Sequence, residues 1–182
     1  HAIDIEAIRS RIMRGSSVPT GGITPSILAS NPDAEKRLPY DINRSRQLLA
    51  EAGYSNGFEV TLDCPNNRYV NDEEICIAVA SMLAKVGINA TLVSYEWGEY
   101  RKRMQAGEHQ MGFLGWTGDN GDPDNFLAVL LGCDKTGKPN ANNIPKWCND
   151  KFQEDITKAA EITDQAERTA LYQDAQKIVA AE

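Results

Sequence analysis

The residues best suited to chemistry lie between positions 115 and 126, where three aspartates, three glycines and a tryptophan occur together. Glycine lets the backbone approach a ligand closely, tryptophan offers a flat apolar wall with a polar edge, and aspartate supplies negative charge for a cationic group. This combination is typical of a binding loop. Its candidate ligand contacts are Trp116, Thr117, Gly118 and Asp119.

The three aspartates have different local roles. Asp122 precedes Pro123 and is expected to cap the next helix, and Asp124 suits the positive end of that helix. Asp119 either stabilises the glycine loop as an Asx-turn residue or offers a free carboxylate to a ligand. The spacing does not match a calcium loop, because Asp124 and Leu130 occupy the positions that need glycine and glutamate, so we expect no metal.

A second candidate site follows the strand predicted over residues 57–63. Its loop contains Asn67, Arg68 and Tyr69. An arginine fork suits a carboxylate; the alternative is a solvated loop cation. If Arg68 and Asp119 emerge at the same sheet edge, they offer opposite charges to a zwitterion, and a short peptide can bridge them, since two extended residues span about 7 Å.

Composition excludes several classes of function. The 182 residues are 41% hydrophobic and 25% charged, as in an ordinary globular protein, and the net charge of −7 makes nucleic acid an improbable partner. No apolar run is long enough to span a membrane, and the first residues lack the layout of a secretion signal. Both ends fall inside helical periodicity, which predicts a fragment of a longer protein.

Enzymatic chemistry has little support. No serine or cysteine nucleophile elbow occurs, and His109 lies in a polar turn. The alternative from this class is a metal-assisted hydrolase that uses Asp119, Asp122 and Asp124, but no histidine is near them. A structural or interaction module built on the last helices is a third class.

Strands and helices alternate along the middle of the chain. After a helix over 3–13 and an irregular crossing over 15–39, an α/β core is expected over 41–131, followed by a cysteine loop and helical tail over 132–182. The core has strands at 57–63, 88–95 and 111–116, and helices from 41, 71, 97 and 122. Asn71 and Glu74 are expected to form a capping box, while Trp97 and Tyr100 are expected to pack in the core. The order predicts a mainly parallel sheet with flanking helices, which binds ligands at the carboxyl ends of its strands.

The four cysteines allow different pairings. A disulfide between Cys133 and Cys148 would contribute about 3 kcal/mol on the chain-entropy model and would indicate an oxidising compartment; two separately buried thiols are the alternative. Cys64 and Cys76 are expected to be free core residues.

Residues 115–126, with 95–100 and 107–110, closely resemble the dipeptide-binding proteins of the peptide and nickel family of extracytoplasmic solute-binding proteins, which serve ABC importers. The resemblance implies that residues 1–182 are a single lobe of a two-lobed periplasmic receptor without a cofactor. Its implied partners are short peptides, the permease subunits in the inner membrane and the second lobe of the same protein. Receptors for nickel chelates, haem or glutathione are the alternatives within this class.

The resemblance also implies roles for individual residues. In dipeptide binders the first aspartate of this motif holds the amino terminus of the peptide, and it matches Asp119. A disulfide-closed loop after the following helix matches Cys133 with Cys148. An arginine before the long helix holds the carboxylate, and Arg68 is the candidate, although it stands closer to its helix than in a dipeptide binder.

Overall fold

In the computed structural model, which describes residues 1–182, the chain alternates between two units. Unit 1 comprises His1–Pro19 and Leu38–Gly115, and unit 2 comprises Thr20–Arg37 and Trp116–Glu182. Each unit has its own hydrophobic core. The expectation that residues 1–182 form a single lobe stays a prediction.

Unit 1 is built on a three-stranded parallel sheet in the order β2-β1-β3. The strands are β1 (Phe58–Pro65), β2 (Ile88–Tyr95) and β3 (Met111–Gly112). β1 pairs with β2 along its whole length, from Phe58 opposite Ile88 to Pro65 opposite Tyr95. The predicted parallel sheet is therefore confirmed, although β3 ends earlier than expected.

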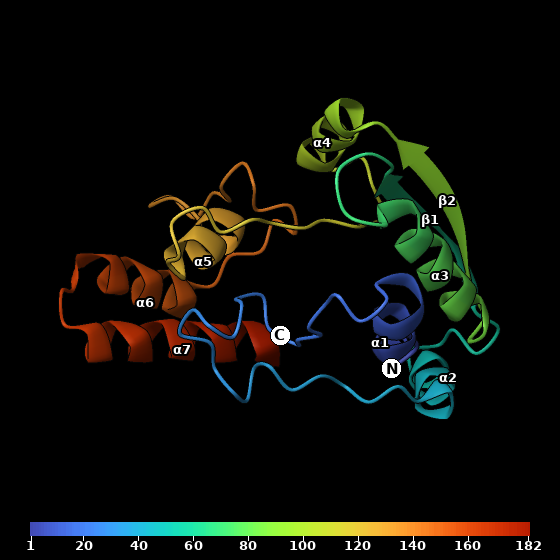
Figure 1. Cartoon of the computed structure of the whole chain (residues 1–182), viewed down its shortest axis with the longest axis horizontal. Helices are drawn as coiled ribbons and strands as arrows, with labels where there is room; N and C mark the ends of the chain where they lie inside the picture. Colours follow the sequence, from blue (N-terminus) through green and yellow to red (C-terminus); the bar gives the residue numbers. More distant parts are fainter. The chain divides into compact units, whose positions relative to one another are not determined.

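The helical segments of unit 1 are α1 (Ile5–Ala7), the π-helical turn η1 (Ile8–Ile12), α2 (Ile42–Glu51), α3 (Asp72–Ala84) and α4 (Trp97–Ala106). Of these, α3 and α4 flank the sheet, as predicted. Figure 1 shows α3 running alongside β1 and β2. Because side chains alternate along a strand, Leu62 and Cys64 of β1 pack toward α3, while Asp63 between them meets Arg103 of α4. The two helices thus lie on opposite faces of β1, and both hold its carboxyl end.

The expected capping box at the start of α3 is not formed. Asn71 does precede the helix, but its backbone is left-handed, with φ of 56°, and its side chain makes no capping hydrogen bond. The side-chain amide of Asn71 instead donates to the carbonyl of Ile12 at 3.0 Å. A long-range contact has replaced the local one.

Unit 2 is mainly helical. Its helices are α5 (Asp124–Leu131), α6 (Asp150–Glu161) and α7 (Gln165–Ala181). Their facing sides form a core that includes Leu127, Phe152 and Tyr172. The irregular segment Thr20–Arg37 joins this unit through α7, since the backbone amide of Asn31 donates to the side chain of Gln176 at 3.1 Å.

All four cysteines are in disulfides. The bond between Cys133 and Cys148 confirms the prediction. The expectation of free thiols at Cys64 and Cys76 is wrong, because β1 and α3 place their Cα atoms 6.5 Å apart, within the range that a disulfide bridges.

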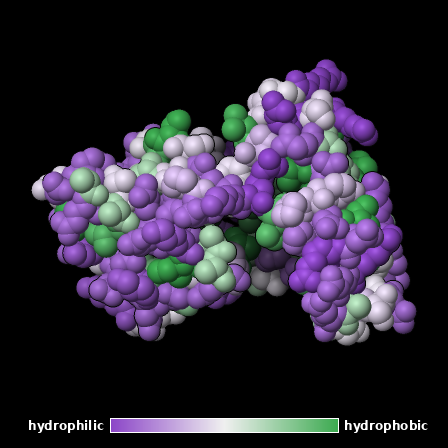
Figure 2. All heavy atoms as spheres, turned by 90° about the horizontal axis from the view of Figure 1, so that it is seen from below, coloured by the Kyte–Doolittle hydropathy of each residue, from purple (hydrophilic) through white to green (hydrophobic).

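No helix is both long and apolar enough to cross a bilayer. Figure 2 shows a face on which hydrophilic residues predominate and hydrophobic ones are scattered in small groups. This surface fits a sequence in which 25% of the residues are charged.

Candidate ligand-binding site

The loop between β3 and α5 leaves one carboxylate without a partner. The side-chain oxygen of Asn120 accepts the amide of Asp122 at 3.1 Å, and the carboxylate of Asp122 accepts the amide of Asp124 at 2.9 Å. Asn120 and Asp122 therefore make the Asx-turn contacts in this loop. Asp119 is exposed and has no hydrogen bond or ion pair. Its alternative role as the Asx-turn residue is wrong.

Asp122 anchors the end of the loop to α7. The guanidinium of Arg168 donates to both carboxylate oxygens of Asp122, at 2.7 and 3.0 Å. Burial raises the pKa of Asp122, but hydrogen bonds from Arg168 and from the amide of Asp124 outweigh it and hold that pKa below its ordinary value. Asp122 thus stays ionised and is fully engaged. Asp124 differs, because burial, together with the charge of Asp122, raises its pKa.

Glycine is required at position 118 by a close approach to the core. A Cβ atom there would lie 2.6 Å from the ring of Phe126, which is 5% exposed and has little room to move. The loop therefore lies directly on the ring. Beside it, the indole nitrogen of Trp116 donates to the side-chain oxygen of Asn125 at 2.8 Å. Trp116 and Thr117 are exposed, so the loop presents them together with Asp119 to solvent.

The loop after β1 in unit 1 is organised by a buried carboxylate. Asp72, at the start of α3, is 4% exposed and accepts the backbone amides of Arg68 and Tyr69, both at 2.9 Å. The side-chain oxygen of Asn67 accepts the amide of Trp97 at 2.9 Å. These bonds hold the loop against the first turns of both α3 and α4. Asp72 was missed in the sequence because its role depends on a turn that residue types alone do not reveal.

Arg68 lies on aromatic rings and has no acidic partner. Its guanidinium carbon is 5.1 Å from the centre of the Trp97 ring and 5.7 Å from that of Tyr69. The Tyr69 ring also meets Phe113 edge to face, and its hydroxyl donates to the carbonyl of Gly115 at 2.9 Å. A cation held by rings keeps its hydrogen-bond donors available. Arg68 is therefore an exposed fork ready for an anion.

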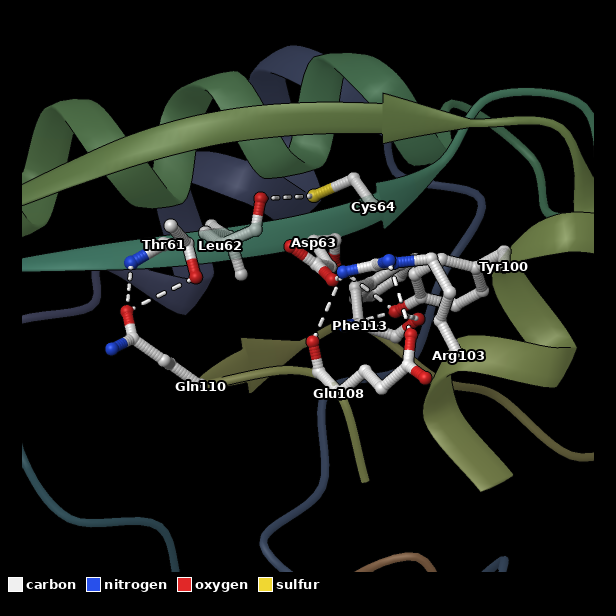
Figure 3. Close-up of polar contacts among 9 residues, drawn as sticks. All are labelled: Thr61, Leu62, Asp63, Cys64, Tyr100, Arg103, Glu108, Gln110 and Phe113. Atoms are coloured by element: carbon white, nitrogen blue, oxygen red, sulfur yellow. Dashed lines mark hydrogen bonds and ion pairs between the residues drawn. The ribbon is translucent and has the colours of Figure 1, made fainter. Parts of the chain in front are cut away.

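Behind this loop, α4 is fixed to the sheet by a buried tyrosine. The hydroxyl of Tyr100 accepts the amide of Phe113 at 2.8 Å and lies 3.0 Å from the carbonyl of Asp63 (Figure 3). The amide nitrogen of Phe113 also lies 3.3 Å from the carbonyl oxygen of Asp63. The Tyr100 hydroxyl therefore competes with that carbonyl for the Phe113 N–H, just after β3 ends. Burial raises the pKa of Tyr100 to about 12. Tyr100 is fully buried, as predicted, whereas Trp97 is half-buried and also supports Arg68.

A partly buried ion pair completes the same region. Arg103 of α4 lies 3.6 Å from the carboxylate of Asp63 and also bonds Glu108 (Figure 3). The carboxylate of Asp63 is almost fully buried and is thus committed to the scaffold. Arg68, in contrast, has no ion pair and stays available to a ligand. Because Arg68 belongs to unit 1 and Asp119 to unit 2, their predicted peptide-length separation stays a prediction.

Chemically, the two loops offer complementary groups. The carboxylate of Asp119 can accept hydrogen bonds from an ammonium group, and the guanidinium of Arg68 can donate two to a carboxylate. Arg168, which anchors Asp122, is the main residue that the sequence does not reveal, because a helix rich in charged residues is expected to face solvent. No group of three or more histidine, cysteine, aspartate or glutamate side chains is placed to hold a metal ion.

Comparison with known proteins places these loops in context. A family model described as "Bacterial extracellular solute-binding proteins, family 5 Middle" matches residues 1–138. The di/tripeptide-binding protein 3 of Pseudomonas aeruginosa is 40% identical over 98% of this chain and 33% of its own length. Heme-binding protein A of Haemophilus influenzae is 37% identical over 98% of this chain and 33% of its own length.

The fold agrees with these similarities. The periplasmic binding protein DppA of Helicobacter pylori, solved with the peptide STSA, matches with a TM-score of 0.88 and 34% identity over 99% of this chain and 35% of that one. The chain therefore spans about a third of the length of the proteins that it matches.

Proposed function

The chain belongs to family 5 of the bacterial extracellular solute-binding proteins, and from that premise we propose that it forms part of the peptide-binding site of an ABC importer's periplasmic receptor. The proposed ligands are di- and oligopeptides, bound without chemical change. Relatives of this chain are named as di/tripeptide-binding proteins, which supports this ligand class.

The free carboxylate of Asp119 is the observation that carries the proposal. A loop that needed Asp119 for its own structure would engage it, yet Asn120 and Asp122 make the Asx-turn contacts instead. A carboxylate without a partner can meet the ammonium of a peptide in a charge-assisted hydrogen bond. We assign it the peptide amino terminus, with Trp116, Thr117 and Gly118 beside it.

Arg68 is proposed to hold the peptide carboxylate. It is held by the rings of Trp97 and Tyr69 rather than by an acid, so binding a carboxylate breaks no existing ion pair. Tyr69 and Asn67 belong to the same proposed contact region. If the receptor binds only the two termini, it makes no specific contacts to the side chains of the peptide. Such a receptor is expected to have broad specificity.

Delivery requires parts beyond this chain. The proposed partners are the second lobe of the same receptor and the permease subunits in the inner membrane. Ligand shifts the receptor toward a closed form because that form satisfies the ligand from both sides. Two disulfides suit the oxidising periplasm.

Haem is the second candidate ligand. A relative of 37% identity is named a heme-binding protein. The exposed guanidinium of Arg68 suits a haem propionate as well as a peptide carboxylate. The two candidates differ at Asp119, because haem offers no ammonium group.

The ligand can be identified by native mass spectrometry of the complete protein that carries this chain, purified from periplasm without denaturation. Peptides with free termini are expected in the bound fraction. Their binding is then measured by calorimetry with a dipeptide, a tripeptide and hemin. Binding of hemin with no binding of either peptide would contradict the proposal.

A further inference from the structure

The disulfide between Cys64 and Cys76 closes the loop that carries Arg68. Cys64 is the penultimate residue of β1, and Cys76 lies in the second turn of α3. Each cysteine is 2% exposed, so the bond is shielded from solvent. Asn67, Arg68 and Tyr69 all lie between the two bridged residues. The bridge therefore encloses the residues to which we assign the peptide carboxylate.

Asp72 carries the conformation of this loop. Its carboxylate accepts the amides of both Arg68 and Tyr69, whereas the loop's backbone bonds include one from Asn66 to Tyr95 at 3.1 Å and a long one from Asp72 to Tyr69 at 3.4 Å. A movement of Asp72 thus moves both amides. The guanidinium of Arg68 lies on the rings of Tyr69 and Trp97 without an acidic partner, so its position also depends on its own backbone.

The disulfide ties the side of α3 that carries Asp72 to β1. Asp72 and Cys76 are four residues apart in α3 and therefore lie on the same side of the helix. The bond from Cys76 to Cys64 holds that side of the first two turns against the end of β1. Without it, the start of α3 is held to the strand by side-chain packing around Leu62, which leaves more freedom to shift.

We propose that the Cys64–Cys76 disulfide is a positioning element of the ligand site, which acts through Asp72 to hold Arg68 where it meets a peptide carboxylate. This inference rests on the proposed function. It assigns the bond a role in ligand selection that goes beyond stability. The Cys133–Cys148 disulfide lies in unit 2 and does not enclose the loop that carries Arg68, so we assign it no such role.

The test compares two peptides on matched variants of the complete protein that carries this chain. The variants are the wild type, Cys64→Ala with Cys76→Ala, Cys133→Ala with Cys148→Ala, and Asp72→Asn. The ligands are a dipeptide with a free carboxylate and the same dipeptide with a carboxyl-terminal amide, measured by calorimetry. Circular dichroism and urea unfolding show that each variant is folded at the assay temperature.

The readout is the ratio of the two affinities. In the wild type the free carboxylate is preferred. In the Cys64/Cys76 variant and in Asp72→Asn we expect this preference to fall about tenfold, the lower range for loss of a hydrogen bond to a charged group. Affinity for the amide should stay within about twofold, since the amide makes no ion pair with Arg68. The Cys133/Cys148 variant should lose stability but keep the wild-type preference.

Other outcomes overturn the inference. An unchanged preference in the Cys64/Cys76 variant shows that the bond does not position Arg68, and an equal loss for both peptides shows a general structural effect. If that variant does not fold, an unchanged preference in Asp72→Asn still refutes the inference, because the bond is proposed to act through Asp72. A wild type that binds the free peptide without preferring it to the amide removes Arg68 from the site, and one that binds neither peptide refutes the proposed function; both refute this inference as well.

Discussion

Replacing Asp119 by asparagine tests the proposed site most directly. The carboxylate has no partner within the protein, so its loss should leave the free energy of unfolding within about 0.5 kcal/mol of wild type, as for ordinary surface changes. Binding should respond differently. The exchange removes the charge from a hydrogen bond to the peptide ammonium but keeps one acceptor oxygen.

The size of the loss in peptide affinity shows whether the receptor closes over its ligand. An exposed ion pair contributes about 1 kcal/mol or less, whereas a hydrogen bond to a charged group in a dry site contributes about 1.5 to 3 kcal/mol. If the receptor closes over its ligand, we therefore expect Asp119→Asn to weaken dipeptide binding by about 10- to 150-fold. A loss of affinity near fivefold instead indicates a site that stays accessible to solvent when the peptide is bound.

The assay is calorimetry on the complete protein with a dipeptide and its N-acetyl derivative. Acetylation removes the ammonium, so the wild type and the variant should bind the acetylated peptide alike. Asp174→Asn is the matched control, because Asp174 is exposed and pairs only with Lys177 at the surface. An unchanged dissociation constant for the free peptide, or an equal loss for both peptides, would falsify the assignment of Asp119.

Three further predictions concern the scaffold. Asp122→Asn should lower the free energy of unfolding at neutral pH by about 1 to 3 kcal/mol, because it weakens the bond to Arg168. The folded pKa of Asp122 lies below its unfolded value of 3.8, so this difference should vanish as the pH falls through the folded pKa. Urea unfolding of both proteins at several pH values measures it. Tyr100→Phe should remove one of the tyrosines that ionise only at about pH 12, and ultraviolet titration that still counts the same number contradicts its burial. Gly118→Ala should cost about 1 to 3 kcal/mol by overpacking against Phe126 and should displace the loop; an unaltered melting temperature together with unaltered dipeptide binding disproves the close approach.

Local signals predicted much of the fold. The bounds of β2 and the start of α4 match the expected positions, because a stretch rich in apolar and β-branched residues ends just before Glu96. The sequence predicts a helix that begins at residue 41, and Asp41 caps α2, accepting the amide of Arg44 at 2.9 Å. Both signals act over a few residues and need no tertiary contact, which is why they are visible in the sequence.

Contacts between distant residues could not be predicted in this way. The Cys64–Cys76 bond requires the end of β1 and the second turn of α3 to meet, and spacing alone does not give that distance. Arg168 reaches Asp122 across 46 positions, so its role as an anchor is invisible in a helix of charged residues. The free state of Asp119 likewise depends on which neighbours take over the loop's hydrogen bonds.

The order of the chain has a consequence for the folding of unit 2. Asn31, in the segment Thr20–Arg37, bonds Gln176 of α7 across 145 positions of the sequence. All three strands of unit 1 lie between these two parts, so unit 1 can form its sheet before this contact is made. The segment Thr20–Arg37 can therefore join unit 2 only after this long intervening stretch has closed into a loop, and such distant closure slows folding.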